Sequence, residues 1–510
     1  MNRTEKFMWN SLSAAILQVV TMIAGLITPH IMLSVYGSDI NGLITSINQF
    51  ISYFNLVEAG LAAATIYALY APLANDNYDE INSIVTASKQ FYIQSGFIFV
   101  ALTVGLALLY PIFVKSEVLS HFEVAVLVLI LGVSGALEFF TLAKYRAILT
   151  ADQKTYIIAF TSTLIIILNT IITIIAASFR LNVILMRGVI LLTVFLRSII
   201  LSLYVKRKYE YIRFNAEPNK KALNKRWDAL YQQILGSAQN GAPVVIITFL
   251  TNLKQVSVYS IYGMVLGGLN GLLSIFTSGL AASFGEVIAQ KNTKTLQKAY
   301  SEFEYCYYMV ITILYSICFI TILSFVKIYT ANIVDTDYTV PIYGFLFTLN
   351  GLLYNVKTPQ GMLVISAGLY KETRWRSTIQ AMLIIVPGIV FTYFWGIIGM
   401  MLALCLSNIY RTVDLMFFIP KFVTGLPVLQ TFKRMLRIII CALISMISCQ
   451  LVGRDIQIDS LYRWVLYATV SGIYVSVVVI AINAIAERRE FKNICIRVYG
   501  MVVKRLGKVS

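Results

Sequence analysis

A few ionisable residues interrupt the long apolar stretches of this sequence, and they could bind an ion or an anionic ligand. They are Glu58, Glu138, Arg197, Lys357, Arg411 and Asp414. An ionisable group at the centre of a bilayer costs about 2.5–3.5 kcal/mol even on the most lenient scale, so such groups normally face a cavity or a partner. The six residues therefore indicate internal ion pairs or a binding site.

Lys357 is the most informative of these residues because of its neighbours. It lies near the middle of an apolar stretch that also contains Asn355, Gln360 and a proline. Proline cannot donate a backbone hydrogen bond, so the helix is predicted to break beside the lysine, and membranes tolerate a break only where protein or water covers it. A lysine in this setting favours an anionic headgroup as its ligand. The alternative is an internal ion pair with Glu58 or Glu138.

The other intramembrane charges also allow two interpretations. Arg411 and Asp414 lie three residues apart on one helical face and could neutralise each other. Arg197 could extend its charge to the interface. We take as candidate substrate-binding residues Lys357, Arg197, Arg411, Asn355 and Gln360. The candidate residues for ion coupling or internal ion pairing are Glu58, Glu138 and Asp414.

No pattern in the sequence is typical of an enzyme or a metal site. There are two histidines and no HExxH, GxSxG or Walker motif. The six cysteines lie mostly in apolar runs without CxxC spacing. Asp335 and Asp337 form a DxD motif, which a glycosyltransferase would need to bind a metal ion. In a short polar turn, however, two such residues indicate a solvent-exposed surface. We predict no enzyme activity, no catalytic residue, no metal and no cofactor, with a proton or sodium gradient as the candidate energy source.

The elements that must position these residues are membrane-spanning helices. The 510 residues are 58% hydrophobic and 13% charged, against about 25% charged in soluble domains, which excludes a soluble globular protein. A membrane helix needs about 20 apolar residues, and continuous runs of that length indicate helices instead of a β-barrel. Fourteen predicted spans cover 9–35, 40–69, 91–114, 122–143, 156–177, 182–205, 229–252, 255–283, 303–328, 340–366, 377–395, 397–420, 435–453 and 461–485.

The distribution of basic residues predicts the orientation of these spans. Of the 41 lysines and arginines, 31 fall in alternate segments that include both ends of the chain, seven fall in the intervening loops, and three lie within spans. Because basic loops stay on the cytoplasmic side, both termini are predicted to be cytoplasmic. The net charge of +17 therefore faces lipid headgroups, and nucleic acid is not an expected partner.

The sequence also suggests an internal repeat. Residues 60–63 and 279–282 share the letters Gly-Leu-Ala-Ala at an offset of 219, and each tetrapeptide precedes a polar segment, 75–90 or 289–302. We expect these segments to be helices lying along the cytoplasmic interface. The predicted organisation is a six-helix lobe (1–205), a basic cytoplasmic linker (206–228), a second six-helix lobe (229–420), two further helices (421–486) and a basic tail (487–510). The fold class is all-α integral membrane, with two bundles around a central cavity.

The sequence resembles the Wzx-type polysaccharide-biosynthesis flippases, within the superfamily that also holds multidrug/toxic-compound extruders and lipid II flippases. The stretches that carry the resemblance are 35–43, 48–50, 58–61, 68–74, 357–359 and 367–373. The resemblance implies a flippase in the bacterial plasma membrane. Its substrate would be an undecaprenyl-pyrophosphate-linked oligosaccharide moved from the inner to the outer leaflet by alternating access. Membrane lipids and polysaccharide-assembly proteins are the expected partners.

Two other functions remain alternatives at this point. A multidrug or small-molecule exporter of the same superfamily usually has twelve spans and a dominant acidic site. A membrane polymerase or glycosyltransferase would need catalytic residues on a substantial outer loop, and the largest hydrophilic loop here is a predicted inner one.

Overall fold

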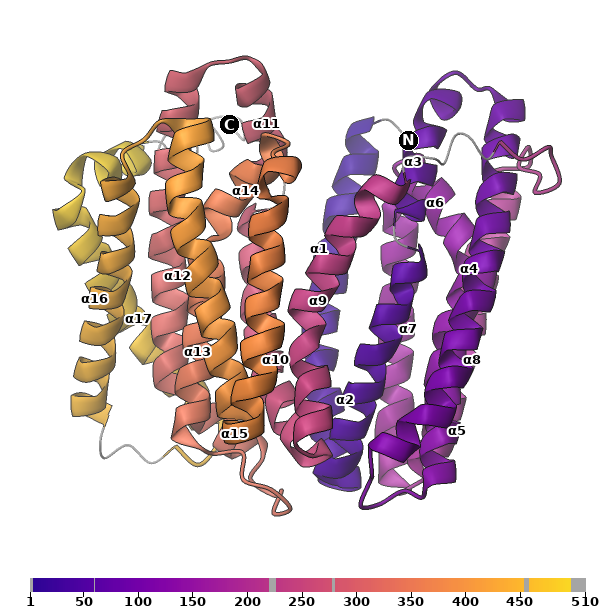
Figure 1. Ribbon diagram of the computed structural model, residues 1–510, viewed down its shortest axis with the longest axis horizontal. Coiled ribbons are helices and arrows are strands. Elements are labelled where there is room, and N and C mark those ends of the chain that lie inside the picture. Colours follow the sequence, from indigo (N-terminus) through magenta and orange to yellow (C-terminus); the bar gives the residue numbers. More distant parts are fainter. Residues whose placement is uncertain (1–2, 59, 220–225, 278–279, 454–457, 497–510) are drawn as a thin grey trace, which may run out of the picture. The chain divides into compact units, whose positions relative to one another are not determined.

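Long apolar helices make up the protein, as their composition requires in a bilayer, where each backbone group must be satisfied within its own segment. The computed structural model describes residues 3–58, 60–219, 226–277, 280–453 and 458–496, and within these ranges the chain is helical and contains no strand (Figure 1). The α-helices are α1 (Arg3–Ile31), α2 (Gly37–Phe54), α3 (Leu61–Ala74), α4 (Tyr78–Phe113), α5 (His121–Leu137), α6 (Ala143–Ala151), α7 (Thr155–Ser178), α8 (Val183–Lys208), α9 (Arg226–Leu250), α10 (Leu253–Thr277), α11 (Leu280–Ala289), α12 (Thr293–Tyr329), α13 (Pro341–Val356), α14 (Thr358–Ser366), α15 (Tyr370–Ile419), α16 (Val428–Gly453) and α17 (Leu461–Ala486).

These helices account for each predicted span. Among the described residues, nine helical segments are long and apolar enough to cross a membrane, and two of them are long enough for two predicted spans each: Glu5–Ala74 and Tyr370–Thr424. The three remaining spans correspond to α9, to α13 with α14, and to α16. The chain is therefore a multi-pass membrane protein of the all-α class.

Glycine is required at two positions: at a sharp turn within α15 and at a close approach between α2 and α10. Within α15, Gly396 has φ 55° and ψ −133°, a conformation that only glycine adopts readily, so two helices follow each other without a loop. In α2, a Cβ on Gly42 would lie 1.8 Å from the carbonyl oxygen of Leu253, so only glycine lets α2 approach the start of α10 this closely.

The prediction of helices lying flat along the interface is wrong. Residues 78–90 form the first turns of α4, which continues for 36 residues, and residues 293–302 do the same in the 37-residue α12. At about 1.5 Å per residue, such a helix exceeds the roughly 30 Å hydrocarbon core. The polar segments are therefore extensions of membrane helices beyond the bilayer.

The chain divides into two compact units. The first unit comprises Met1–Ile261 and Asn332–Thr336, and the second comprises Tyr262–Ala331 and Asp337–Ser510. α9 belongs to the first unit, although the sequence assigns residues from 229 onward to the second lobe. The hydroxyl of Thr248 donates to Ser46 at 2.9 Å, and Phe249 packs edge-on against Phe50, so α9 is held against α2. Where the repeat itself begins stays a prediction.

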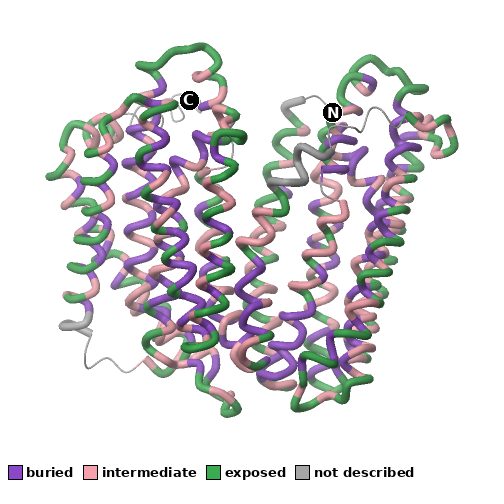
Figure 2. The backbone as a smooth tube through the Cα atoms, viewed as in Figure 1, coloured by how far each residue is buried: buried purple, intermediate pink, exposed green. Residues whose placement is uncertain are grey.

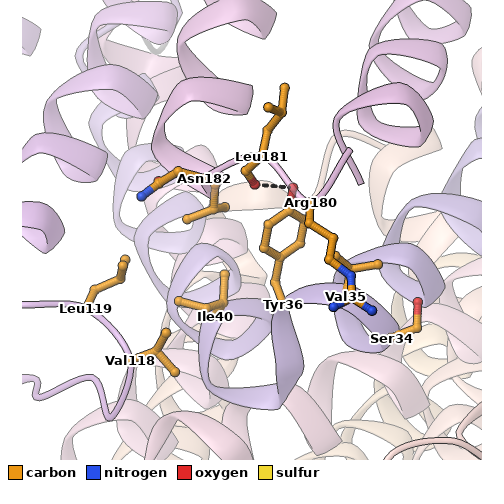
Figure 3. Close-up of a pocket in the computed structure, with 10 residues that line it drawn as sticks. Ser34, Val35, Tyr36, Ile40, Val118, Leu119, Arg180, Leu181 and Asn182 are labelled. Atoms are coloured by element: carbon orange, nitrogen blue, oxygen red, sulfur yellow. Dashed lines mark hydrogen bonds between the residues drawn. The ribbon is translucent and has the colours of Figure 1, made fainter. Parts of the chain in front are cut away.

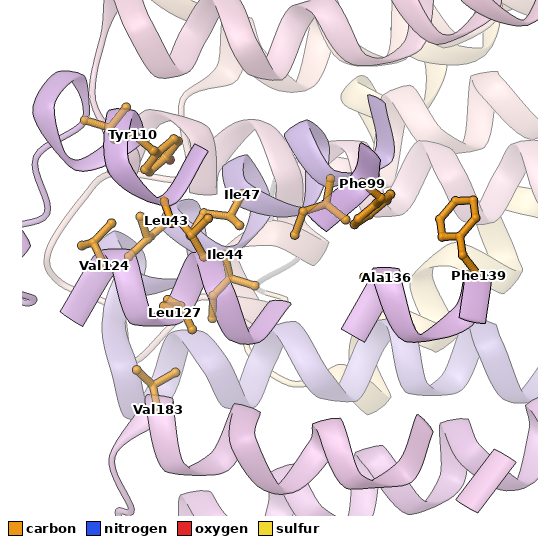
Figure 4. Packing of buried hydrophobic residues seen from close by; sticks show 14 of the residues in the cluster. Leu43, Ile44, Ile47, Phe99, Tyr110, Val124, Leu127, Ala136, Phe139 and Val183 are labelled. Carbon is orange, nitrogen blue, oxygen red and sulfur yellow. The ribbon is translucent and has the colours of Figure 1, made fainter. Parts of the chain in front are cut away.

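The core of the first unit lies between α2, α4, α5 and α8. Leu43 and Ile47 of α2, Phe99 of α4 and Leu127 of α5 belong to one buried apolar cluster (Figure 4). Exposed positions occur along the length of the helices (Figure 2). They include apolar residues such as Phe97, Leu108 and Ile112. In a bilayer these side chains contact lipid tails, so their exposure carries no penalty.

Both units contain the same helix start. Asn77 caps α4 by accepting a hydrogen bond from the backbone of Glu80, and Asn292 caps α12 by accepting one from Thr295. The residue before each asparagine has a positive φ, 50° and 55° respectively. This matched turn is consistent with the repeat that the sequence suggests.

Candidate functional site

The second unit contains the predicted helix break, with Lys357 at its centre. α13 ends at Val356 and α14 begins at Thr358, so Lys357 is the joint between them. The hydroxyl of Tyr308 donates to the carbonyl oxygen of Val356 at 2.9 Å. A buried side chain from α12 thereby satisfies an acceptor at the end of α13, as a membrane interior requires.

Lys357 contacts polar and aromatic groups within its own unit. Its Nζ donates to Oδ1 of Asn408 at 2.6 Å and lies 4.7 Å from the ring centre of Tyr354. Asn408 in turn donates to Asn350 at 2.8 Å. Among the residues that the structure describes, no carboxylate forms an ion pair with Lys357. Glu58 and Glu138 belong to the first unit, and the ion pair with either of them stays a prediction.

Arg411 and Asp414 form the ion pair that their spacing predicts, at 2.9 Å. A second arginine, Arg376, also binds the Asp414 carboxylate, and its guanidinium lies 5.1 Å from the ring centre of Phe418. One carboxylate therefore serves two arginines, and Arg411 also repels Lys357. Counting these four ionisable groups as charged, the cluster in the second unit carries a net charge of +2.

Asn355 and Gln360 lie in buried hydrogen-bond networks beside the break. Asn355 donates to Asn270 and Tyr315, both at 2.8 Å, and accepts from Tyr307 at 2.9 Å. Gln360 donates to Glu304 at 3.1 Å and to Tyr308 at 2.8 Å. Both residues hold α13 and α14 against α12 or α10, and their predicted contact with substrate stays a prediction.

Glu304 is the centre of a buried ionic network that sequence inspection missed. It accepts hydrogen bonds from Tyr300 and Thr431 and forms an ion pair with Arg434 at 2.9 Å, in which both side chains are 2% exposed. Arg434 and Arg437 also pair with Glu487. These residues lie near the ends of the predicted spans, where a charged side chain does not by itself indicate a site. The network ties α16 and α17 to α12.

In the first unit, Glu138 lies where α5 changes into a π-helical turn, Glu138–Leu142. Its carboxylate pairs with Arg197 and Arg146, both at 2.9 Å, and Arg197 also donates to Ser162 at 3.0 Å. Arg146 was assigned to a loop in the sequence analysis, so its role was missed. A cavity of about 480 Å³ beside this cluster is lined by both apolar and polar side chains, and the polar ones include Gln18, Ser162, Asn169, Thr193, Glu138 and Arg197.

Glu58 is half-buried at the end of a short 3₁₀ turn, Asn55–Glu58. It interacts electrostatically with Arg146 and Glu138. No hydrogen bond or ion pair links its carboxylate to another described residue. Of the three candidate carboxylates, Glu138 and Asp414 are each held by two arginines, and Glu58 is not.

A further cavity of about 470 Å³ lies where α4 leads to α5 and α7 leads to α8 (Figure 3). Tyr36 crosses it and donates its hydroxyl hydrogen to the carbonyl oxygen of Leu181 at 2.9 Å. Arg180 and Asn182 form its polar wall. The charged clusters of Glu138 and Lys357 take no part in it.

Both DxD residues accept hydrogen bonds from other residues of the protein. Asp335 accepts hydrogen bonds from the backbone N–H and the hydroxyl of Ser38, at 2.8 and 2.6 Å. Asp337 accepts from the backbone N–H of Thr339 at 2.8 Å. Within the part of the chain that the structure describes, no group of three or more His, Cys, Asp or Glu residues could hold a metal ion.

The fold is similar to those of solved membrane transporters. Comparison with solved structures gives the lipid II flippase MurJ, with a TM-score of 0.67 and 16% identity over 94% of this chain and 98% of that one. A multidrug resistance MATE family transporter of the MOP superfamily has a TM-score of 0.64 and 13% identity, over 78% of this chain and 95% of that one. No protein-family model and no curated protein sequence matches the chain. At these identities the likeness establishes the fold.

Proposed function

We propose that the protein is a flippase for an undecaprenyl-pyrophosphate-linked oligosaccharide. It would move this lipid from the inner to the outer leaflet of a bacterial plasma membrane by alternating access, for cell-surface polysaccharide synthesis. The fold shared with a lipid II flippase supports a lipid-linked substrate. Membrane lipids surround the protein, and polysaccharide-assembly proteins are its proposed partners.

The observation that carries the proposal is the uncompensated positive charge at the helix break. Lys357 has an asparagine and a tyrosine as its neighbours, and Arg411 and Arg376 share a single carboxylate. A pyrophosphate loses its hydration on entering the membrane, and only nearby cations and hydrogen-bond donors can replace that water. A net charge of +2 in a poorly hydrated site suits this dianionic group.

The arrangement also allows release of the lipid. Lysine presents a single point charge, whereas arginine binds phosphate in a planar, bidentate fork. Oδ1 of Asn408 accepts a hydrogen bond from Nζ of Lys357 at 2.6 Å. In this proposal Asn408 remains as a neutral partner of the ammonium group after the pyrophosphate has left. In this proposal Asn355 and Gln360 position the break, and Arg197 is neutralised by Glu138 in the other unit.

Ion coupling is assigned in the same proposal to Glu58. Glu138 and Asp414 each pair with two arginines, so protonating either carboxylate would leave both of its arginines without an anionic partner inside the membrane. Glu58 forms no ion pair with an arginine among the described contacts. A proton or a sodium ion could therefore bind there at lower cost.

The test is transport by the purified protein in proteoliposomes loaded with a fluorescent undecaprenyl-pyrophosphate-linked saccharide. Lys357→Ala should reduce the flipping rate by about tenfold or more, which corresponds to the loss of one charge-assisted contact. Lys357→Arg should restore part of the rate. Lys327→Ala, which removes an exposed lysine from the end of α12, is the matched control and should flip normally.

The second candidate, a multidrug exporter, is favoured by the structural likeness to the MATE family transporter. The positive cluster at Lys357 argues against cationic drugs, because like charges repel one another. Drug efflux by the wild-type protein, combined with normal lipid flipping by Lys357→Ala, would support the exporter and contradict the flippase.

A further inference from the structure

Residues 209–214, which follow α8, fold back and pack against the first unit. The side chain of Asn82 on α4 donates to the carbonyl oxygen of Tyr211 at 3.0 Å and accepts from the backbone N–H of Arg213 at 2.7 Å. Tyr209 is buried, and Phe214 packs against the same apolar cluster of α3, α4, α6 and α8. The position of Phe214 is therefore fixed by packing and by hydrogen bonds.

Three lysines from three different helices lie near this segment: Lys89 of α4, Lys144 of α6 and Lys206 of α8. The ammonium groups of Lys89 and Lys144 lie 5.8 and 5.1 Å from the ring centre of Phe214. Lys144 is half-buried and is repelled by both Lys89 and Lys206. We call these three residues the lysine cluster.

The lysine cluster contains no compensating carboxylate. Within the described ranges, none of its three members forms an ion pair. At the neighbouring turn, by contrast, Lys6 and Lys154 both pair with Asp152, at 2.8 and 2.6 Å. The first unit therefore neutralises one group of lysines internally and leaves a second group to repel one another. An anion bound between them would remove that repulsion.

The position of the cluster indicates where the anion comes from. Lys89, Lys144 and Lys206 lie one or two residues beyond predicted membrane spans, 91–114, 122–143 and 182–205, at the level of the lipid headgroups. Basic residues at this depth are attracted to anionic lipids.

We propose that the lysine cluster binds the phosphate of one anionic lipid in the leaflet that faces the proposed cytoplasmic side. The lipid headgroup enters between the three ammonium groups, and its acyl chains lie along the apolar outer face of the unit. The site is separate from the Lys357 cluster and does not depend on the proposed transport function.

The experiment is native mass spectrometry of the full-length protein released from nanodiscs that contain phosphatidylglycerol and phosphatidylcholine. The wild type should retain one phosphatidylglycerol in preference to phosphatidylcholine. The triple variant Lys89→Gln, Lys144→Gln and Lys206→Gln should bind it about a hundredfold more weakly, because each basic residue near the surface contributes several-fold to the affinity. A triple Lys→Arg variant keeps the charges and should keep the lipid.

The matched control removes three exposed cations from the same segment: Arg207→Gln, Lys208→Gln and Arg213→Gln. Retention of lipid by the control, together with its loss from the cluster variant, supports the proposal. Equal losses in both variants would show a general surface-charge effect and overturn it. Displacement of the lipid by millimolar inorganic phosphate would assign the cluster to free phosphate and also overturn the lipid source.

Discussion

Glu138 in the first unit and Lys357 in the second lie 219 residues apart, the same offset as the repeated Gly-Leu-Ala-Ala tetrapeptide. Each residue lies where a membrane helix departs from regular α-geometry. The two sites nevertheless differ in charge balance. Glu138 pairs with two arginines, whereas Lys357 has no carboxylate partner among the described residues of its own unit. The helix irregularity thus holds an ion cluster in the first unit, and in the proposed function it holds a binding site in the second.

The largest expected effect on transport comes from replacing Lys357 with glutamate, the residue found at the corresponding position, Glu138, in the first unit. Lys357→Glu places a carboxylate where the pyrophosphate should bind, and like charges in such a site cost several kcal/mol. The flipping rate in proteoliposomes should fall by about a hundredfold or more. Lys327→Glu makes the same charge change at an exposed position and should flip normally. If Lys357→Glu flipped the lipid at more than half of the wild-type rate, Lys357 would not be a binding residue and the contrast with Glu138 would be wrong.

A large effect on stability is expected at Glu304. Glu304→Ala leaves Arg434 buried with one carboxylate instead of two, so the free energy of unfolding should fall by up to about 3–5 kcal/mol. Denaturant titration in detergent micelles measures this change. Glu286→Ala removes an exposed glutamate and should change the stability little. A loss at Glu304 no greater than that at Glu286 would contradict the importance of the network.

A smaller effect is expected at Glu138. Its side chain is 38% exposed, against 2% for Glu304, so water can partly replace the carboxylate. Glu138→Gln should lower the free energy of unfolding by about 1–3 kcal/mol, the usual cost of leaving a polar partner unsatisfied. The apparent affinity for substrate should stay close to wild type. A weakened affinity with unchanged stability would instead place Glu138 in the binding site.

The smallest effect concerns Asp152 and depends on pH. Burial raises the pKa of this carboxyl, but hydrogen bonds from Lys154, Lys6 and Tyr209 outweigh burial and hold the pKa below 3.8. Because the folded pKa is depressed, the stabilisation is present above the unfolded pKa and is lost as the pH falls through the folded one.

Asp152 is partly exposed, so solvent screening limits the stabilisation to about 1 kcal/mol or less. Thermal melts of wild type and Asp152→Asn should differ at about pH 7 and converge toward about pH 3. Melting temperatures that differ equally at both values would contradict this assignment.

Much of the fold was predictable because a membrane helix is encoded by local composition. Each apolar run became a helix, and the proline after Lys357 indicated the break. The continuation of α4 and α12 was not predictable, because an amphipathic segment looks the same whether it lies flat or extends a longer helix. Arg376 binding Asp414 was missed because the residues lie 38 positions apart and meet only through helix packing. Asn408 was missed because it lies 51 positions after Lys357, in another predicted span, and meets the lysine only through helix packing.

The contact between Lys357 and Asn408 also has a consequence for biosynthesis. Asn408 lies 51 residues after Lys357 in the chain. At about 5–20 residues per second, the ribosome adds it about 3–10 seconds after the lysine. During that interval the α13–α14 span must enter the membrane with a charge that costs about 2.5–3.5 kcal/mol and has no Asn408 to bind. Stable insertion of this span therefore depends on the arrival of α15, and truncation of the nascent chain before Asn408 should leave the span poorly inserted.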